Sequence, residues 1–415
     1  MVHIFLLLYN LLLIAFLIPI LLVIILSGKR NRKEFFYCIF ERLACYKNFN
    51  LDKNKKTVWI HCASLGEARA VEPMLDKLAD YNIVLTSITK SAREYLIQLN
   101  KANYVALAPV DLYPFVISAV SKIKPDMLIL IETEIWPSLI YCVKKYGAKV
   151  VVVNGRISKT AFKYYKVTSL FWKQFLSLTD SILVRNETDF KYFNSILGSS
   201  TKLEITGNIK YDRNWQSALL TRDMLSYKED DLILVAGSTK NNEETILTDV
   251  YVNLKNKYKN LKLIIAPRHI TRIPEISNIL KQKNIKFSLM SKCIDEDVLL
   301  VDVFGKLQSL YSIADIVFVG GSLINSGGQN PIEPSAYAKP IIFGKYMFNF
   351  ESEADLLKKS KAAFEVNDKK ELEETIDKLL TDKNLRLSTG NNAVSVVNAQ
   401  KGNIDRNIKL IKQWI

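Results

Sequence analysis

The sequence predicts an α/β protein built from two successive doubly wound halves, with an apolar segment in front of them. Short apolar runs alternate with amphipathic stretches of helical period, a pattern typical of parallel strands covered by helices on both faces. The pattern fades over a polar stretch at 211–230 and then restarts. A chain of 415 residues also exceeds one ordinary hydrophobic core, so two domains are expected.

The predicted strands are the apolar runs at 57–61, 82–86, 127–131, 149–153 and 181–184 in the first half, and at 232–236, 262–266, 298–301 and 316–319 in the second. Helices are predicted around 67–80, at 335–340 and over the amphipathic stretch 368–415. In open sheets of this kind, ligands bind outside the carboxyl ends of the strands. Two such halves therefore imply a ligand crevice between them.

An apolar segment without acidic or basic residues extends from Ile4 to Leu26. About 20 apolar residues suffice to span a bilayer as a helix. A cleaved signal peptide is the competing interpretation, but no basic residue other than His3 precedes the segment and no Ala-x-Ala site follows it. The basic cluster at 29–33 favours a cytoplasmic body. We therefore predict an uncleaved single-pass anchor at 1–28 and a basic juxtamembrane connector at 29–56.

The net charge of +15 is spread along the chain, so the anionic lipid surface of the same membrane is the simplest partner. Charge alone also permits nucleic acid, but no helix-turn-helix, zinc-finger or ribonucleoprotein pattern supports it. The five cysteines lack metal or redox spacing, which indicates reduced thiols in the cytoplasm. The three histidines form no cluster with cysteines or carboxylates, so neither a metal nor a cofactor is expected.

The glycine-rich stretch 320–334, Gly-Gly-Ser-Leu-Ile-Asn-Ser-Gly-Gly-Gln-Asn-Pro-Ile-Glu-Pro, carries the strongest functional signal. Its glycines let backbone amides approach a ligand closely. The predicted helix start after it offers further N–H groups to an anion, and a nucleotide phosphate is the natural ligand. The alternative is a capping box formed by Asn330 and Glu333, with Pro331 at the first helical position. The two roles can coexist.

Polar residues also follow the first predicted strand, in His-Cys-Ala-Ser-Leu-Gly-Glu at 61–67. Ser64 and Glu67 have the spacing of a capping box, and spacing alone favours that role. The functional alternative is that Glu67 faces the crevice as a general base.

Charged residues stand at other predicted strand ends. Glu132 and Glu134 follow an apolar strand, where carboxylates are costly unless they are paired or face a ligand. Lys210 lies where an inter-domain crevice is expected, although a solvated lysine is the more common outcome. Arg268 ends another strand and is placed to direct a guanidinium at a phosphate.

The segment from Arg156 to Trp172 interleaves lysines with aromatic residues. This mixture suits a lipid headgroup interface. Helix packing explains the aromatic residues equally well.

In their order and spacing, these motifs resemble those of the bacterial 3-deoxy-D-manno-octulosonic acid (Kdo) transferases, which glycosylate a lipid A precursor on the inner membrane. The resemblance covers nearly the whole chain, including the N-terminal anchor. Its motifs are His-Cys-Ala-Ser-Leu-Gly-Glu at 61–67, Glu-Thr-Glu-Ile-Trp-Pro at 132–137, Asn-Gly-Arg-Ile-Ser at 154–158, Gly-Asn-Ile-Lys-Tyr-Asp at 207–212, Ala-Pro-Arg-His at 266–269 and Gly-Gly-Gln-Asn-Pro-Ile-Glu-Pro at 327–334. Each motif alone is weak, whereas the ordered set is specific.

The resemblance implies a GT-B architecture, in which two Rossmann-like domains face a cleft. It implies inverting transfer of Kdo from CMP-Kdo to a hydroxyl of the lipid A precursor, in lipopolysaccharide biosynthesis at the bacterial inner membrane and without a metal. The implied domains are an acceptor domain at 57–212, a linker at 213–230, a CMP-Kdo-binding domain at 231–395 and a C-terminal helix at 396–415.

By the same resemblance, Glu67 is the general base, which reverses the preference set by spacing alone. Glu132 and Lys210 support the transition state. The implied CMP site consists of Pro267, Arg268, Phe304, Gly305, Lys306, Asn330, Pro331, Ile332 and Glu333.

Two positions depart from the family's pattern. The family commonly has histidine where Gln329 stands, and often another near Lys240. Glutamine keeps the hydrogen bonding but does not titrate near neutrality, so we expect altered donor binding rather than lost activity. The rival interpretations are a GT-B glycosyltransferase with another nucleotide sugar and lipid acceptor, and a non-enzymatic membrane-bound scaffold.

Overall fold

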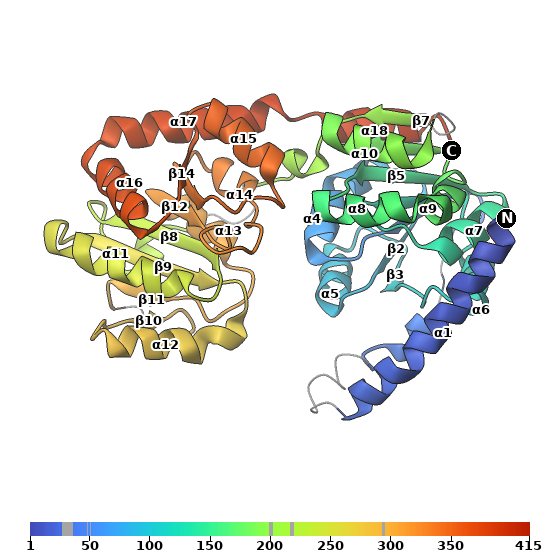
Figure 1. The fold of residues 1–415 in the computed structure, drawn as a ribbon, viewed down its shortest axis with the longest axis horizontal. Coiled ribbons are helices and arrows are strands. Elements are labelled where there is room, and N and C mark those ends of the chain that lie inside the picture. The colour runs from blue at the N-terminus through green and yellow to red at the C-terminus, as the bar shows by residue number, and fades with distance from the viewer. Residues whose placement is uncertain (27–35, 48, 50, 199–201, 216–219, 293–294) are drawn as a thin grey trace. The chain divides into compact units, whose positions relative to one another are not determined.

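The computed structural model describes residues 1–26, 36–47, 49, 51–198, 202–215, 220–292 and 295–415. These residues form two compact units, one of Met1–Arg213 with Lys401–Ile415 and one of Asn214–Gln400 (Figure 1). Each unit is built around a seven-stranded parallel sheet. The α/β fold with two Rossmann-like halves, predicted from the sequence, is therefore confirmed.

The sheet of the first unit has the strand order β3-β2-β1-β4-β5-β6-β7. Its strand β1 is buried along its whole length, which explains the unbroken apolar run that predicts it. The chain moves to opposite sides of β1 to form β2 and β4, so the topological switch point lies between β1 and β4. The strands are β1 (Thr57–His61), β2 (Asn82–Ser87), β3 (Tyr104–Leu107), β4 (Met127–Ile131), β5 (Lys149–Gly155), β6 (Ser181–Val184) and β7 (Lys202–Ile205).

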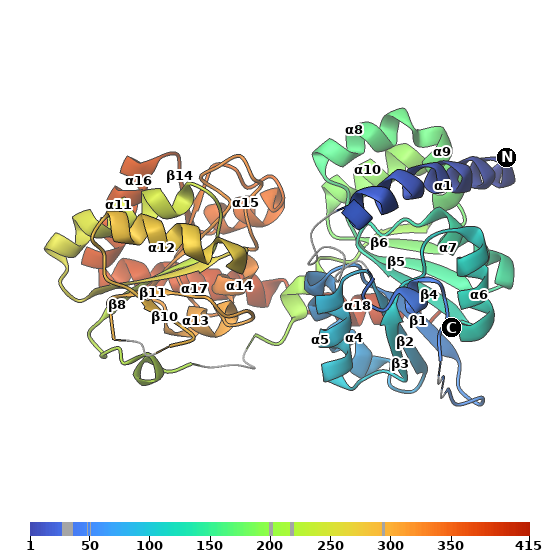
Figure 2. The ribbon, with the colours of Figure 1, turned by 90° about the horizontal axis from the view of Figure 1, so that it is seen from below.

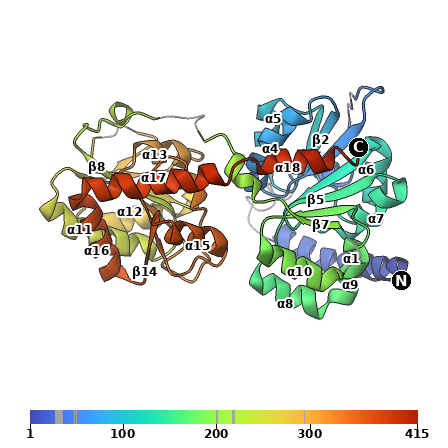
Figure 3. The same cartoon turned by 90° about the horizontal axis from the view of Figure 1, so that it is seen from above.

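Helices cover both faces of this sheet, as two separate groups of buried apolar residues show. The last helix of the chain returns to this unit and lies beside α4 and η1 (Figure 3). The helices are α1 (Val2–Leu26), α3 (Ile39–Arg42), α4 (Leu65–Lys77), α5 (Lys90–Leu99), α6 (Tyr113–Ile123), α7 (Pro137–Tyr146), α8 (Lys159–Val167), α9 (Ser169–Leu176), α10 (Glu187–Leu197), the 3-10 turn η1 (Ile209–Asp212) and α18 (Asn403–Ile411).

The apolar N-terminal segment folds as α1, which lies beside α7 and α9 of the first unit (Figure 2). Asn10 joins them: its Nδ2 donates to Ser138 Oγ at 3.2 Å and its Oδ1 accepts from Tyr113 N at 2.8 Å. In the part of the chain that the structure describes, no helix is both long and apolar enough to cross a membrane. The predicted basic cluster at 29–33 lies outside the described residues.

The sheet of the second unit has the strand order β10-β11-β9-β8-β12-β13-β14. Its switch point lies between β8 and β12, because β9 and β12 flank β8 on opposite sides. The strands are β8 (Leu232–Thr239), β9 (Leu261–Pro267), β10 (Ser288–Leu289), β11 (Val298–Leu300), β12 (Ile316–Val319), β13 (Ile341–Gly344) and β14 (Ala363–Val366).

The stretch predicted as a polar linker contributes to the second unit, where Leu225 and Tyr227 are buried in the core. The amphipathic helices predicted over 368–415 are confirmed as α16, α17 and α18. The helices of the second unit are η2 (Arg222–Leu225), α11 (Glu243–Lys257), η3 (Ile270–Arg272), α12 (Ile273–Gln282), α13 (Leu307–Ile313), α14 (Ile332–Ser335), α15 (Glu351–Lys359), α16 (Lys369–Thr381) and α17 (Lys383–Ala399).

The helix predicted at 335–340 is wrong in its position. The structure has a single turn, α14, that ends at Ser335. Ala338 has a φ of 54°, which an α-helix does not allow, and Pro340 has no amide hydrogen for a helical bond. The chain instead enters strand β13.

Candidate active site

Glu67 lies in the first turn of α4, directly after the carboxyl end of β1, and its residue is only 8% exposed. Ser64 Oγ accepts a bond from Glu67 N at 3.4 Å and donates one to Glu67 Oε1 at 2.8 Å. Glu67 Oε2 accepts from Ala63 N at 2.7 Å. The capping role predicted from the spacing is thus confirmed, and it also fixes the direction of the carboxylate.

Glu132 directly follows β4, the strand on the other side of the switch point. Its φ of 63° is unusual for a residue with a side chain, and a bond from its amide to Val153 O at 2.9 Å holds it in place. Its carboxylate faces two cations: Lys210 Nζ lies 2.5 Å from Oε1, and Arg156 Nη1 lies 3.7 Å from Oε2. The structure therefore joins Glu132 and Lys210 in one buried ion pair.

Lys210 owes its position to two asparagines. Asn208 caps the turn η1 and accepts a bond from Lys210 N at 3.1 Å. Asn154, at the end of β5, accepts one from Ile209 N at 3.1 Å. No separate role was predicted for Asn154, which appears only within the motif Asn-Gly-Arg-Ile-Ser at 154–158. Asn154 thus connects the sheet to the backbone that carries Lys210.

The surroundings of Glu67 and Glu132 shift the two carboxyl groups in opposite directions. Burial raises the pKa of Glu67, and the charge of Glu132 raises it further, to about 7. Burial also acts to raise the pKa of Glu132, but Lys210 and Arg156 outweigh burial and hold that pKa below its ordinary value. Near neutral pH, Glu67 can therefore exchange a proton while Glu132 stays ionised, a combination typical of acid–base sites.

Glu134, the second carboxylate of this strand end, has other partners. Its Oε2 accepts a bond from Trp136 Nε1 at 2.8 Å and lies 3.7 Å from His61 Nε2. The rings of His61 and Trp136 meet edge to face. The charge of Glu134 also contributes to the raised pKa of Glu67. These groups therefore extend the site from the switch point toward the end of β3.

The residues implied for CMP all follow strands of the second sheet. Pro267 and Arg268 stand at the end of β9, Phe304, Gly305 and Lys306 follow β11, and the stretch Asn330–Glu333 follows β12. Arg268 and Lys306 are exposed, as is Phe304. Asn330 Oδ1 accepts a bond from Ile332 N at 3.0 Å. The predicted capping box is nevertheless wrong, because Pro331 occupies the N-cap position of α14 and no side chain caps that turn. The nine residues thus share one edge of the second sheet.

The structure corrects the prediction that the glycine-rich loop offers its first amides to a phosphate. The amides of Gly321, Ser322 and Leu323 donate to the carboxylate of Glu243, at 2.6, 3.0 and 3.1 Å. The amide of Lys240 donates to the same carboxylate at 2.9 Å. Glu243 belongs to α11, so the sequence of the loop alone does not reveal it. Moreover, α14 has only four residues, too short to act as a dipole.

The two departures from the family's pattern meet in this loop. Gly321 has a φ of 68°, and a Cβ atom there would lie 3.4 Å from Gln329 Nε2 and 3.6 Å from the Lys240 side chain. Lys240 Nζ also bonds Ser326 Oγ. Gln329 and the methylene groups of Lys240 therefore both lie next to Gly321, and the Lys240 ammonium group bonds Ser326.

Two family models together cover most of the chain. Residues 38–213 match the model described as 3-deoxy-D-manno-octulosonic-acid transferase (kdotransferase), and residues 222–396 match that of the group 1 glycosyl transferases. A 3-deoxy-D-manno-octulosonic acid transferase of Haemophilus influenzae is 34% identical over 378 residues, which are 86% of this chain and 87% of that protein. The chain belongs to the Kdo transferase family. It is a glycosyltransferase, as its motifs predict.

One further sequence relative and one solved structure are similar to this Kdo transferase chain. A bifunctional glycosyltransferase/methyltransferase of Fusobacterium nucleatum is 33% identical over 354 residues, which are 81% of this chain and 55% of that protein, so the chain spans about half of that relative. A solved glycosyltransferase of Rickettsia africae matches with a TM-score of 0.61 at 15% identity, covering 87% of this chain and 99% of that one. This last likeness shows the fold alone.

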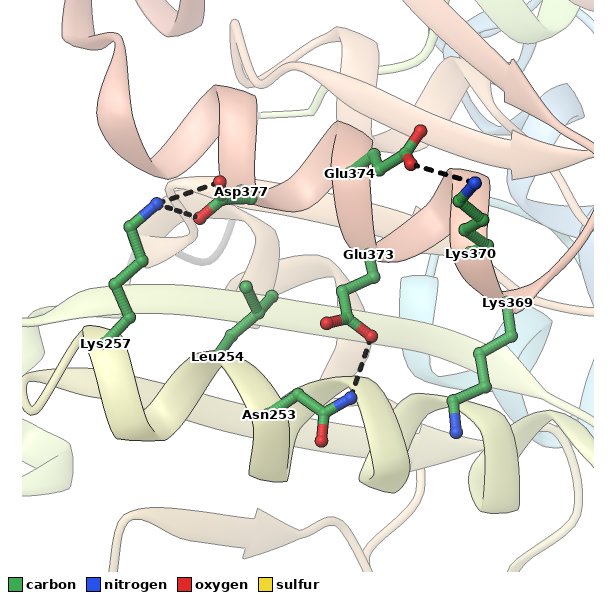
Figure 4. A pocket seen from close by; sticks show the side chains of 8 residues that line it. All are labelled: Asn253, Leu254, Lys257, Lys369, Lys370, Glu373, Glu374 and Asp377. Atoms are coloured by element: carbon green, nitrogen blue, oxygen red, sulfur yellow. Dashed lines mark hydrogen bonds and ion pairs between the residues drawn. The ribbon is translucent and has the colours of Figure 1, made fainter.

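A hollow of about 610 Å³ lies between α11 and α16 of the second unit (Figure 4). Its charged side chains pair with one another: Lys257 with Asp377 at 2.7 Å, and Lys370 with Glu374 at 3.8 Å. Asn253 donates to Glu373 at 2.9 Å. The contacts of Lys257 and Asn253 join α11 to α16, whereas the pair of Lys370 and Glu374 lies within α16. We therefore assign the hollow a structural role.

Proposed function

We propose that the chain transfers Kdo from CMP-Kdo to a hydroxyl of an acylated lipid A precursor, with Glu67 as the general base. The observation that carries this proposal is the position of Glu67 at the switch point of the first sheet, beside the ion pair of Glu132 and Lys210. A base with a pKa near the working pH combines a populated basic form with useful proton affinity.

In the proposed reaction, Glu67 takes the proton of the acceptor hydroxyl while the oxygen attacks the anomeric carbon of Kdo. The bond from that carbon to the CMP phosphate breaks, and CMP leaves with the electron pair. Attack from the face opposite CMP inverts the anomeric centre. Glu67 then returns the proton to water. Lys210, held by Glu132, supplies a fixed positive charge, and preorganised charges are an effective way to stabilise a transition state.

The exposed cations at the edge of the second sheet support the donor half of the proposal. Arg268 and Lys306 follow neighbouring strands β9 and β11 and suit the single phosphate of CMP. The amides at 321–323 of the glycine-rich loop already donate to Glu243. We therefore assign the phosphate mainly to the side chains of Arg268 and Lys306.

We also propose that the enzyme resides at the bacterial inner membrane, with its N-terminal segment as the anchor and both units on the cytoplasmic side. The outward side of α1 supports this, because Leu7, Leu8, Leu11 and Leu12 are each more than half exposed. Such a run of apolar side chains is typical of a membrane contact. The expected result is that the full chain sediments with membranes and resists extraction by 1 M salt. Release by salt would leave only an electrostatic association.

Donor competition tests the proposed donor against the rival GT-B interpretation. CMP is expected to protect the second unit from proteolysis and to inhibit transfer, whereas UDP at the same concentration is expected to do neither. Protection by UDP would instead favour another nucleotide sugar. Loss of cellular function in Glu67→Ala, with normal protein levels, would exclude the scaffold interpretation.

A further inference from the structure

A second, smaller pocket of about 190 Å³ opens in the first unit, beside the candidate active site. It lies at the carboxyl edge of the sheet, beyond the ends of β1, β2 and β3, and α1 forms one wall. Most of its lining is apolar, and Leu13, Val110 and Trp136 contribute to it. The ionisable residues of the lining are Arg42, His61 and Asp111.

The size of the pocket limits what it can hold. A dry apolar cavity of about 150 Å³ holds a benzene molecule, whereas pockets for drug-sized ligands measure roughly 300–1,000 Å³. A pocket of about 190 Å³ therefore suits a short apolar segment, such as part of an alkyl chain. It is too small for a nucleotide, and its mostly apolar lining does not suit a sugar.

Two buried polar atoms in this lining lack a partner. Among the described residues, neither His61 Nε2 nor Arg42 Nε has a hydrogen-bond partner. His61 is 1% exposed, and Glu134 Oε2 lies 3.7 Å from its Nε2, beyond hydrogen-bond reach. Arg42 uses Nη2 to bond Ile88 O at 2.8 Å, which leaves Nε unused. Buried polar atoms without partners are costly and rare.

Arg42 Nε always carries a proton and is therefore a hydrogen-bond donor. Thr86 Oγ1 accepts the indole N–H of Trp59 at 2.8 Å and lies 3.1 Å from His61 Nδ1. In the tautomer in which the hydroxyl of Thr86 donates to Nδ1, His61 Nε2 carries the imidazole proton and is also a donor. With His61 in this tautomer, the missing partner of both residues is an acceptor oxygen.

The pocket also adjoins the proposed catalytic groups. Trp136 lines the pocket and donates to Glu134, whose charge reaches Glu67. Leu13 of α1 also lines the pocket, and the leucines at positions 7, 8, 11 and 12 of the same helix are exposed. A chain entering beside α1 would thus end near the general base.

We propose that this pocket binds an acyl chain of the lipid acceptor, whose ester or amide carbonyl oxygen accepts from Arg42 Nε and His61 Nε2. The assignment rests on the proposed function, because it places the acceptor's chain beside Glu67. It makes α1 part of the substrate site and not only an anchor.

The kinetic test fills the pocket and compares two acceptors with the same sugar headgroup. One is the tetra-acylated lipid A precursor, and the other lacks its ester-linked chains. In Leu13→Trp, we expect the ratio of kcat/KM for the acylated over the de-acylated acceptor to fall by more than about tenfold, as is usual when an apolar pocket loses its fit. Val110→Trp, from another wall, should act alike. An unchanged ratio in both variants would overturn the proposal.

The matched control is Leu12→Trp, at the neighbouring position of α1, where the side chain is 58% exposed. This variant adds the same bulk to the same helix outside the pocket. Its acceptor ratio is expected to equal that of the unmodified protein. A tenfold fall in this control as well would mean that bulk on α1, rather than the pocket, determines the ratio.

A binding test separates failure of this inference from failure of the proposed reaction, because it needs no transfer. The full chain in detergent is labelled with a phosphatidylglycerol that carries a diazirine in its acyl chain, and the labelled peptides are identified by mass spectrometry. Label on peptides containing Val110 or Trp136, displaced by the tetra-acylated acceptor but not by the de-acylated one, supports the pocket. Label that the acceptor does not displace assigns the pocket to a bilayer lipid and overturns the acceptor assignment.

Discussion

The pKa of Glu67 is raised and that of Glu132 is lowered, because different atoms surround the two carboxylates. Both are buried, but Glu132 faces Lys210 and Arg156, whereas the partners of the Glu67 carboxylate among the described residues are Ser64 and the amide of Ala63. Two carboxylates in such unequal surroundings titrate at different pH values. The pair therefore assigns proton exchange to Glu67 and charge stabilisation to Glu132.

Sequence spacing predicted part of this arrangement. The cap of Ser64 on Glu67 is local and was readable from the sequence. The contact between Glu132 and Lys210 joins residues far apart in the chain, and neither side chain carries a local signal for it. The resemblance identified Glu132 and Lys210 as site residues. The fold adds that Asn154 accepts a bond from Ile209 N, which fixes the backbone next to Lys210.

The pH dependence of kcat/KM tests the assignment of the base. Because Glu67 must be deprotonated to act, we expect activity to rise with pH through about 7 and then to level off. In Glu132→Gln, the negative charge that raises the pKa of Glu67 is removed. The rise should then move to lower pH, with a lower plateau because Lys210 loses its partner.

Glu72→Gln is the matched control for this experiment, since Glu72 belongs to the same helix and bonds Tyr95 instead. Its profile is expected to follow that of the unmodified protein. A rise that stays near pH 7 in Glu132→Gln would contradict the proposed coupling of the two carboxyl groups.

Among the elements, the glycine-rich loop shows how a distant residue changes the meaning of a motif. Its glycines suggested amides that are free for a phosphate, but Glu243 of α11 accepts four amide bonds there. The carboxylate is fully buried, and burial raises its pKa despite these bonds. The first part of the loop, including Gly321, therefore has a structural role, because its amides bond Glu243.

Glu243→Gln is expected to destabilise the protein by about 3 kcal/mol, because an amide offers one acceptor oxygen and turns its NH₂ group toward backbone donors. A lower midpoint of urea unfolding and weaker CMP binding would show this. Glu275→Gln, an exposed position paired with Arg272, should change the midpoint little. An unaltered midpoint in Glu243→Gln would mean that the loop does not depend on this carboxylate.

Helix α1 is a second element with a structural feature that its sequence did not predict, since hydrogen bonds attach it to the first unit. Its apolar composition predicted an anchor, but it also contains Asn10, which bonds Ser138 and the amide of Tyr113. In Asn10→Leu, these bonds are lost, at a cost of about 1–3 kcal/mol. We expect α1 to become protease-sensitive in detergent while the rest of the unit stays resistant. Equal resistance in Leu11→Asn, an exposed control, and in Asn10→Leu would contradict a docked α1.

At the scale of the whole molecule, the sequence predicted the two sheets well where strands are central. Strands such as β1, β4 and β12 are buried throughout and therefore read as unbroken apolar runs. The outer strands β3, β7, β10 and β14 were not predicted. They are short, and β14 includes an exposed glutamate, Glu365, so composition gives them little contrast with loops. The inner strand β13 was also missed, although it is buried throughout, because the helix wrongly predicted at 335–340 ends directly before it.

The proposed reaction is tested by transfer from CMP-Kdo to the tetra-acylated lipid A precursor by the purified full chain, with product masses determined. We expect a mass gain of one or more Kdo units. The rate of transfer should fall at least about 100-fold in Glu67→Gln, as expected for the loss of a general base, and should be retained in Glu72→Gln. No Kdo product from the unmodified protein, under conditions in which the Haemophilus influenzae relative is active, would contradict the proposed reaction. Full activity in Glu67→Gln would contradict the proposed base.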